Sequence, residues 1–365
     1  MLLTLYLLTS FVYFRLCGLL LIEEDDITNN DDVNKHADIA AASFGQNCCG
    51  SVSLGKRSRF KFHKEYSFLK ISNISGLVEL QSTCLCAVNT QQQLSIQCNL
   101  VNFPMLASAL GDYARDVPID LVYVNNSAIV ELPENVFRSL KISNLQLNNG
   151  KISKISPDAF RGLEDTLQGV NLADNDLSEV PVETLRTLRL LNSLDLTNNK
   201  IQYVPNNAFV TIRLKTLKLS DNNLTIADGA FSGLEQSLKN LNLKGCSLKE
   251  VPKALSSLAG LAFLDLAQNS IRELGDGLLS DLSSLTALNL ERNVIQTLHP
   301  AVFYGVNDTL SSLSLLNNLL TSYPTQAITS LSELRVSRNN FKFAFSFLSI
   351  VSIITSVMKK GSGII

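Results

Sequence analysis

The sequence predicts an α/β repeat solenoid, a chain wound into successive coils that each contain one short strand. One pattern, L-x-x-L-x-L-x-x-N-x-L, recurs from residue 119 onward at intervals of about 24 residues. Apolar residues make up 45% of the chain and charged residues 18%, which favours a buried core over disorder. The first apolar position of each unit falls at Ile119, Ile142, Leu167, Leu191, Leu214, Leu238, Leu261, Leu285, Leu310 and Leu331.

Residues 1–22 are apolar except for Arg15 and a few hydroxyl side chains, and an acidic run beginning at Glu23 follows them. Such a segment is typical of a secretory signal peptide. It lacks a basic start and a clear cleavage site of small residues, so an uncleaved signal anchor is the alternative interpretation. Both interpretations direct the chain into the secretory pathway.

Residues 23–83 differ in composition from the repeats that follow. Acidic residues dominate the start of this segment, and a basic cluster that includes Lys56 and Arg57 comes after them. We expect a pre-domain of low order in which these charges are solvated.

The cysteines are concentrated ahead of the repeats. Clustered cysteines behind a secretory signal indicate local disulfides, so residues 84–118 are predicted to form a cysteine-bearing N-terminal cap. Cys246 instead occupies a core position of a repeat, where we expect a buried thiol. Five of the seven cysteines lie in the cluster: Cys48, Cys49, Cys84, Cys86 and Cys98.

Residues 119–341 contain the ten repeats. In the unit that starts at Leu191, Leu194 and Leu196 alternate like a short strand with one buried face. The ninth position is Asn in most units, and a buried Asn can both donate to and accept from backbone groups of adjacent coils. The asparagines predicted to form this ladder are Asn175, Asn199, Asn222, Asn269, Asn293, Asn318 and Asn339.

A second apolar column follows the ladder position in each unit. Its members are mostly aromatic, and we expect them to stack along the convex side of the solenoid. They are Phe137, Phe160, Leu185, Phe209, Phe231, Leu255, Leu279, Phe303 and Ile328.

Residues 342–365 form an apolar C-terminal tail. Its run from 343 to 358 would span about 24 Å as a helix, which is shorter than the roughly 30 Å of a bilayer's hydrocarbon core. Two lysines at 359 and 360 follow the run, as in a membrane protein whose repeats lie outside the cell. Membrane anchoring through 343–358 and an irregular cap over the last coil are the two interpretations.

The repeats, with P-x-x-x-F tails such as Pro133 to Phe137, resemble the extracellular leucine-rich-repeat proteins of the typical subtype. The Cys84-Leu85-Cys86 segment and the later Cys98 resemble the N-terminal cap of Slit-like, Toll-like and chaoptin-like ectodomains. This resemblance implies a leucine-rich-repeat horseshoe with a parallel β-sheet of about ten short strands along its concave face. It also implies disulfides that join Cys84 to Cys98, and Cys86 to either Cys48 or Cys49.

Four N-x-Ser/Thr sequons would accept N-linked glycans in a secreted chain. A glycan on Asn125, near the end of the first predicted strand, would shield the N-terminal rim of the concave face. The four asparagines are Asn73, Asn125, Asn223 and Asn307.

Binding residues should be strand side chains that repeat packing does not require, because these line the concave face. The fifth and sixth units place several lysines there, with acidic and aromatic neighbours on the adjacent strands. Since strands lie about 4.8 Å apart, we predict a basic patch with an apolar edge, suited to an acidic protein surface or a sulfated glycan. Ordinary solvated strand positions are the alternative. The residues are Lys215, Lys218, Lys239, Lys244, Asp195, Phe263 and Asp265.

Composition argues against several classes of function. The formal charge of −2 disfavours nucleic acid as a partner, and three histidines offer little material for a metal site. Asp195 and Asp265 fall three strands apart, about 14 Å by strand spacing, too far for a glycosidase pair. We therefore expect no enzyme activity, no cofactor and no bound metal.

The predicted function is a non-catalytic extracellular recognition scaffold, in an adhesion, receptor or matrix role. Its partner would be an extracellular protein or a sulfated glycan, met outside the cell or at the cell surface. Two alternatives share the same architecture: a non-catalytic subunit of a secreted enzyme complex, and a truncated Toll-like innate immune receptor.

Overall fold

The structure of the chain, a computed structural model, describes residues 83–88, 93–115, 117–321 and 324–331. Several predictions fall on other residues. The signal segment 1–22, nearly all of the pre-domain 23–83, and the tail 342–365 with its apolar run 343–358 lie outside the described residues, as do Cys48, Cys49, Asn73 and Asn339.

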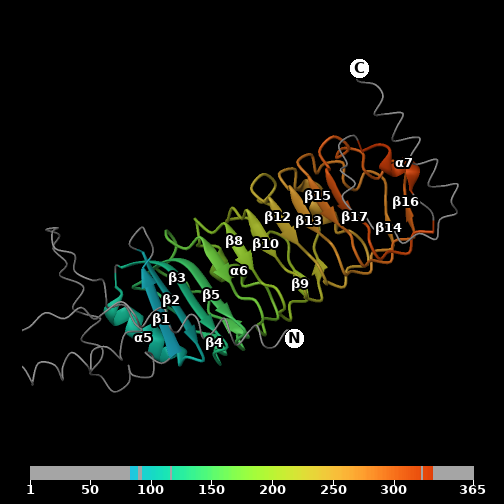
Figure 1. Ribbon diagram of the computed structural model, residues 1–365. Coiled ribbons are helices and arrows are strands. Elements are labelled where there is room, and N and C mark those ends of the chain that lie inside the picture. Colours follow the sequence, from blue (N-terminus) through green and yellow to red (C-terminus); the bar gives the residue numbers. More distant parts are fainter. Residues whose placement is uncertain (1–82, 89–92, 116, 322–323, 332–365) are drawn as a thin grey trace, which may run out of the picture. The chain divides into compact units, whose positions relative to one another are not determined.

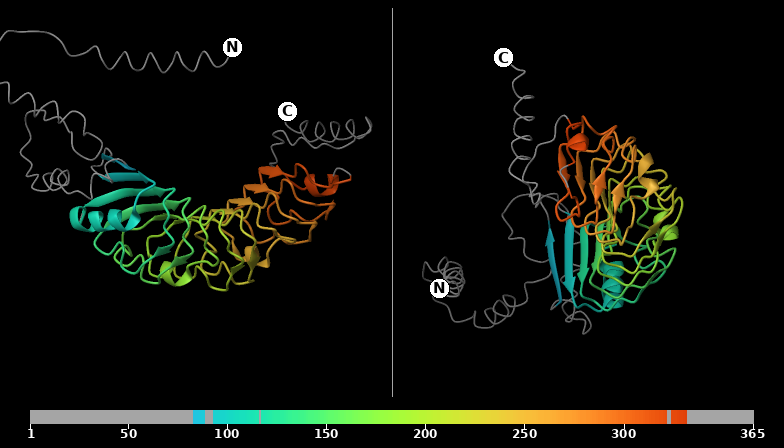
Figure 2. Two further views of the ribbon diagram at one scale, coloured as in Figure 1. Left: turned by 90° about the horizontal axis from the view of Figure 1, so that it is seen from below. Right: turned by 90° about the vertical axis from the view of Figure 1, so that its right-hand side faces the viewer.

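An eleven-stranded sheet runs through the described coils (Figure 1). Its first two strands are antiparallel, and every later neighbour in the order is parallel. The stacked coils follow an arc, with the sheet on the inner, concave side (Figure 2). In order, the strands are β1 (Cys84–Val88), β2 (Leu94–Asn99), β3 (Pro118–Asn125), β5 (Lys141–Asn148), β7 (Gly169–Asn171), β8 (Ser193–Asp195), β10 (Thr216–Lys218), β12 (Asn240–Asn242), β13 (Phe263–Asp265), β15 (Ala287–Asn289) and β17 (Ser312–Ser314).

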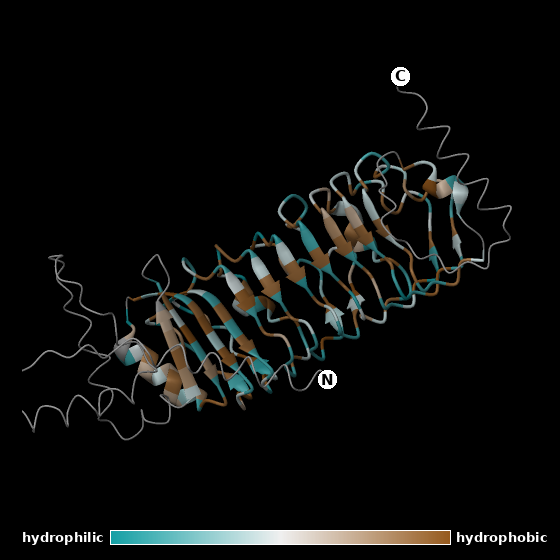
Figure 3. Ribbon diagram, in the orientation of Figure 1, coloured by the Kyte–Doolittle hydropathy of each residue, from teal (hydrophilic) through white to brown (hydrophobic). Residues whose placement is uncertain are grey.

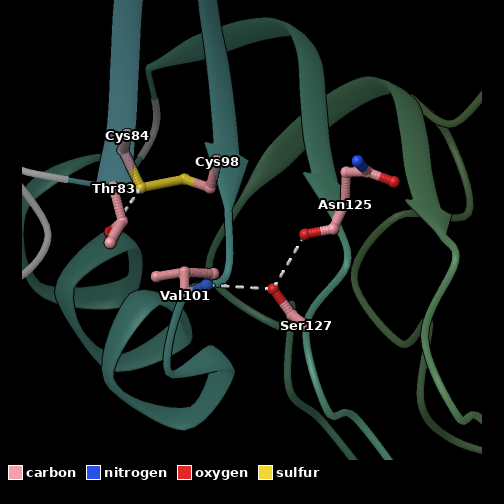
Figure 4. The surroundings of a disulfide bond; sticks show 6 residues. All are labelled: Thr83, Cys84, Cys98, Val101, Asn125 and Ser127. Atoms are coloured by element: carbon pink, nitrogen blue, oxygen red, sulfur yellow. Dashed lines mark hydrogen bonds between the residues drawn. A yellow bond between two sulfur atoms is a disulfide. The ribbon is translucent and has the colours of Figure 1, made fainter.

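The N-terminal end of the sheet is a disulfide-bonded hairpin. Cys84 in β1 faces Cys98 in β2, and their sulfur atoms are bonded (Figure 4). Helix α5 (Phe103–Tyr113) then crosses to the convex side, with the Asn102 side chain accepting a hydrogen bond from the Met105 amide at its start. Because β2 pairs in parallel with β3, the parallel sheet begins one coil before the first predicted repeat, inside the segment predicted as the cap.

The convex side is built from short pieces. Among the described residues α5 is the only long helix. Three two-stranded parallel sheets, β4 with β6, β9 with β11, and β14 with β16, connect neighbouring coils by hydrogen bonds. The pieces are β4 (Glu131–Leu132), β6 (Lys154–Ile155), α6 (Val182–Leu185), β9 (Tyr203–Val204), β11 (Thr225–Ile226), η2 (Lys253–Ser257), β14 (Glu273–Leu274), β16 (Thr297–Leu298) and α7 (Thr325–Ile328).

The core lies between the sheet and these convex pieces. Each three-residue strand buries its middle residue, as Leu194, Leu217 and Leu241 do, and leaves its flanking residues more exposed. Figure 3 shows the resulting interleaving of apolar and polar residues along the long strands β3 and β5. A strand alternates its side chains between two faces, so each coil adds one buried leucine layer and one solvated layer.

Phenylalanine rings stack along the convex side. The Phe137 ring lies 6.1 Å, centroid to centroid, from Phe160, and Phe209 lies 6.3 Å from Phe231 in a stacked arrangement. All four rings are buried. Neighbouring coils therefore contact each other through aromatic surface as well as through backbone hydrogen bonds.

The ladder asparagines join each coil to its predecessor. Asn199 is typical: its Oδ1 accepts from the Leu177 amide at 3.0 Å, and its Nδ2 donates to the Leu172 carbonyl at 2.9 Å and the Leu196 carbonyl at 3.1 Å. Asn175, Asn222, Asn269 and Asn293 are buried in the same arrangement, and Asn318 makes the same bonds while half-buried.

Three other residues take the ladder position in described coils: Gly150, which has no side chain to donate or accept, and Cys246 and Ser127. The Cys246 thiol donates to the Leu219 carbonyl at 3.2 Å, and the Ser127 hydroxyl accepts from the Val101 amide at 3.0 Å. Each thus satisfies a backbone group of the preceding coil, as the asparagines do, with fewer hydrogen bonds.

Candidate functional site

The concave face consists of side chains that the core does not need. Strand pairing puts Asp195, Lys218, Asn242 and Asp265 side by side on adjacent strands, and a second row runs parallel to it two residues earlier. That row contains Ser193, Thr216, Asn240 and Phe263. Every residue in both rows is partly or fully exposed, so the rows form a continuous surface open to a partner.

Asp195 and Asp265 have a structural task that the sequence interpretation missed. The Oδ1 atom of Asp195 accepts a hydrogen bond from the Thr197 amide at 3.0 Å, and Asp265 accepts from the Ala267 amide at 2.9 Å. Asn171, Asn242 and Asn289 do the same in their own coils. These side chains cap the strand where it turns. The sequence carried a signal for this, because Asp or Asn recurs at one repeat position.

Lys218 does not offer a free charge. Its Nζ lies 3.0 Å from Oδ2 of Asp195, and only 14% of the Asp195 side chain is exposed. Asp195 therefore holds the Thr197 amide with one oxygen and the Lys218 ammonium with the other. The Lys218–Asp195 ion pair therefore presents polar atoms in a fixed position on the concave face, with little net charge.

The four lysines do not form one compact patch. Lys215 and Lys239 precede neighbouring strands, and the Lys239 amide donates to the Lys215 carbonyl. Lys244 lies five residues beyond Lys239 in its coil, roughly 16 Å along an extended chain. The Lys239 ammonium donates to the Gly260 carbonyl at 3.1 Å, toward the next coil. Two lysines thus belong to the edge where strands begin, whereas Lys218 and Lys244 lie at or beyond the other end.

Phe263 is the aromatic residue of this part of the concave face. Its ring is 37% exposed, with Asn240 and Ala287 beside it on the neighbouring strands. The residues around it are mainly neutral hydrogen-bonding side chains. This arrangement can receive an apolar group surrounded by polar contacts, as protein interfaces do.

The described residues contain no group of three or more His, Cys, Asp or Glu side chains placed to hold a metal ion. Burial raises the pKa of the Cys246 thiol from 9.0 to about 12, so the thiol stays protonated at neutral pH. Cys84 and Cys98 form the disulfide described above, and Cys86 lies in β1 between them in sequence.

The sequons of the described residues lie at three separate places. Asn125 ends β3 and is half-buried, with its Nδ2 donating to Oδ1 of Asn99 at 3.4 Å. Asn223 is exposed directly after the buried Asn222, and Asn307 lies in the loop before β17. These positions belong to the end of the first repeat strand, to a turn of the fifth coil, and to a loop of the ninth coil.

The repeated coils, the inner parallel sheet and the asparagine ladder define a leucine-rich-repeat horseshoe. A leucine rich repeat family model matches residues 165–224, 212–271 and 263–309. The chain thus carries leucine-rich repeats, and it is similar to the extracellular proteins Tsukushi, podocan and keratocan.

Tsukushi of Gallus gallus is 27% identical over 259 residues, which are 69% of this chain and 68% of Tsukushi. Podocan of Mus musculus is 31% identical over 232 residues, or 61% of this chain and 36% of podocan. The chain therefore spans about a third of podocan's own length.

Two solved structures have a similar fold. One is a crystal structure of a TLR13–ssRNA13 complex, with a TM-score of 0.57 and 27% identity over 65% of this chain and 33% of that one. The other is a complex of Latrophilin 3, Unc5D and the leucine-rich repeats of FLRT2, with a TM-score of 0.54 and 25% identity. That match covers 65% of this chain and 70% of the other.

None of the described helices combines the length and the apolar character needed to cross a membrane.

Proposed function

We propose that this chain is a non-catalytic extracellular recognition scaffold that binds a protein on its concave face, in an adhesion, receptor or matrix role. The observation that carries the proposal is the pair of exposed rows over β8, β10, β12 and β13. Their side chains are not required by the core, and they combine one exposed aromatic ring with fixed polar groups around it.

The binding centre in this proposal is Phe263, with the Lys218–Asp195 pair and Asp265 as the polar groups that orient a partner. Energetically important residues of protein interfaces are often aromatic residues set among polar neighbours. Lys218 is held in place by Asp195, so a partner meets a side chain that has already lost much of its freedom. Lys215, Lys239 and Lys244 would border this centre.

Relatives support the class of function. FLRT2 takes part through its leucine-rich repeats in a complex with Latrophilin 3 and Unc5D, which are proteins. Tsukushi, podocan and keratocan are extracellular leucine-rich-repeat proteins. An extracellular location also agrees with the Cys84–Cys98 disulfide, since such bonds persist in oxidising compartments.

The proposal is tested with the full chain, produced by secretion and immobilised to capture proteins from extracellular fluid, with the captured proteins identified by mass spectrometry. Phe263→Ala removes the exposed ring, and Lys218→Gln removes the cation without placing two negative charges together. We expect each variant to weaken capture at least tenfold, because central interface residues contribute about 2 kcal/mol or more.

Two matched controls accompany these variants. Tyr304→Ala removes a ring that is 71% exposed in another coil, and Lys151→Gln removes an exposed lysine in the second coil's turn beyond the strand. Both controls should capture the partner normally, and all four proteins should melt alike. If the controls lose capture as strongly as the test variants, the concave face is not the binding surface.

A further inference from the structure

Basic side chains gather along one edge of the solenoid, outside the concave face. We call this the leading edge, the set of loops that lead into the N-terminal ends of the parallel strands. It carries Arg115, Arg138, Lys141, Arg213, Lys215 and Lys239, all of them exposed. Because these residues precede or begin parallel strands of one sheet, they lie on the same side of the successive coils.

The basic character is confined to the first six coils. The loops 256–262, 280–286 and 304–311, which lead into β13, β15 and β17, contain no lysine or arginine. The chain as a whole has a formal charge of −2. The basic half of the leading edge is therefore a local feature and not a consequence of overall charge.

Three of the cations surround one hollow. Arg115, Arg138 and Lys141 line a recess of about 620 Å³ together with the polar residues Ser139 and Thr166. Gly162 lies in the same recess, and a Cβ atom there would come within 2.5 Å of the Arg138 carbonyl oxygen. The glycine thus lets the second and third coils approach closely beneath the arginine.

All three arginines of this set can offer their charge to a partner. Among the described residues, Arg115, Arg138 and Arg213 take part in no ion pair. The acidic residue of the recess, Asp165, lies 3.8 Å from Arg189, and both side chains are about four-fifths exposed. Exposed pairs of this kind are weak, so Arg189 can also turn toward an anion.

We infer that the leading edge of coils one to six binds a linear sulfated glycan. A guanidinium group presents a planar fork of donors that matches an oxyanion such as a sulfate ester in two parallel hydrogen bonds. The loops into coils one, two, four, five and six carry cations, Arg189 among them, and such a row suits a chain molecule with repeated anionic groups. The recess has no aromatic side chain among its lining residues, which disfavours a protein anchor or the stacking of bases.

This inference goes beyond the proposed function, because it concerns a different surface and a different class of partner. It shares with that function only the extracellular location. The sequons of the described residues are compatible with it: Asn125 is the last residue of its strand, Asn223 lies beyond the strand of its coil, and Asn307 lies in the loop before β17. Glycans at these positions would leave the leading edge of coils one to six uncovered.

The test measures binding of the full secreted chain to a fluorescent heparin oligosaccharide at 0.15 M salt, by titration. The test variant is Arg115→Gln, Arg138→Gln and Arg213→Gln together. The control variant is Lys151→Gln, Lys249→Gln and Arg272→Gln, which removes the same charge from exposed residues elsewhere. We expect the test variant to bind at least about tenfold more weakly and the control to bind like the unaltered chain.

Further arms separate the alternatives. A desulfated oligosaccharide should bind far more weakly than heparin, and polyglutamate of equal length should not compete. An equal loss of heparin binding in both triple variants would mean that binding depends on total charge and not on the leading edge. Strong competition by polyglutamate would mean that the partner is an acidic protein. Either result overturns the inference. No binding by the unaltered chain overturns it too. Melting curves verify folding, and retained capture on the concave face separates this result from a failure of the proposed function.

Discussion

At the scale of single residues, polar side chains of one coil divide between inward and outward tasks. Asn199 points inward and satisfies backbone groups of two coils, whereas Asp195, four residues earlier, lies on the concave face and caps its strand. Both tasks arise because a coil that turns after a three-residue strand leaves amides and carbonyls without strand partners. The repeat therefore constrains polar positions as strictly as apolar ones.

The ladder position can be tested at Asn269. This buried side chain accepts from the Cys246 and Leu248 amides and donates to the Leu243 and Leu266 carbonyls. Asn269→Leu leaves these groups unsatisfied, and we expect the free energy of unfolding to fall by about 1 to 3 kcal/mol. Urea titration followed by circular dichroism measures the change.

The matched control for that variant is Asn240→Leu, which makes the same substitution on the exposed concave face. It should change the free energy of unfolding by no more than about 0.5 kcal/mol. Similar losses in the two variants would contradict a specific ladder role for Asn269.

Cys246 gives a prediction about reactivity and pH. Burial raises the pKa of its thiol to about 12, so the native protein should leave Cys246 unalkylated by iodoacetamide at pH 8, and denaturant should expose it to labelling. Above pH 9 the unfolded thiol ionises while the native one keeps its proton. Stability should therefore fall as pH rises from 9 toward 12, less steeply in Cys246→Ser. Peptide mapping by mass spectrometry locates the label, and labelling of native Cys246 at the denatured rate would refute its burial.

At the scale of elements, the sequence was sufficient to predict the described strands of the concave sheet from β3 to β17, because their alternation repeats in every coil; the tenth predicted strand lies outside the described residues. It was not sufficient to predict that β2 is the first parallel strand. That coil returns through helix α5 in place of the P-x-x-x-F tail, so it does not match the repeat pattern, although Leu94, Ile96 and Cys98 alternate as strand residues do.

The candidate site shows a different limit of prediction. The repeat pattern assigns a residue to a row on the concave face, but it does not determine where a long side chain turns. Lys218 turns to Asp195 and Lys239 turns to the Gly260 carbonyl, and these contacts depend on the neighbouring coil. Spacing alone predicted a contiguous basic patch. In the structure Lys218 pairs with Asp195, Lys239 lies at the edge where its strand begins, and Phe263 is the exposed aromatic residue.

The aromatic column can be tested at Phe209. This ring is fully buried and stacks on Phe231 in the next coil, so Phe209→Ala removes contacts within and between coils. We expect a loss of about 3 to 5 kcal/mol in the free energy of unfolding, measured by urea titration. The adjacent Val210 is 48% exposed, and Val210→Ala should cost no more than about 0.5 kcal/mol. A small loss at Phe209 would mean that the convex column contributes little to stability.

At the scale of the whole molecule, stacking gives the described coils the same four surfaces: a concave face, a convex side, a leading edge and the turns beyond the strands. Each surface can change its side chains without disturbing the core, since the leucines and asparagines that hold the coils point inward. The chain uses this freedom unevenly. Its exposed aromatic residue Phe263 lies on the concave face in β13, and the basic residues of its leading edge lie in the first six coils.

The last prediction concerns the compartment in which the molecule folds. Secretory folding would attach glycans at the sequons, and Asn223 is well placed to carry one, because it is exposed and follows the buried Asn222 at the turn beyond the strand. When the chain is secreted from animal cells, enzymatic deglycosylation should lower its mass. Asn223→Gln should reduce that mass difference by one glycan. Asn240→Gln changes an exposed asparagine outside any sequon and should leave the mass loss intact. A secreted chain whose mass the enzyme does not change would contradict the assignment of these sequons, and a chain retained unglycosylated in the cytosol would contradict the extracellular location on which both proposed binding surfaces depend.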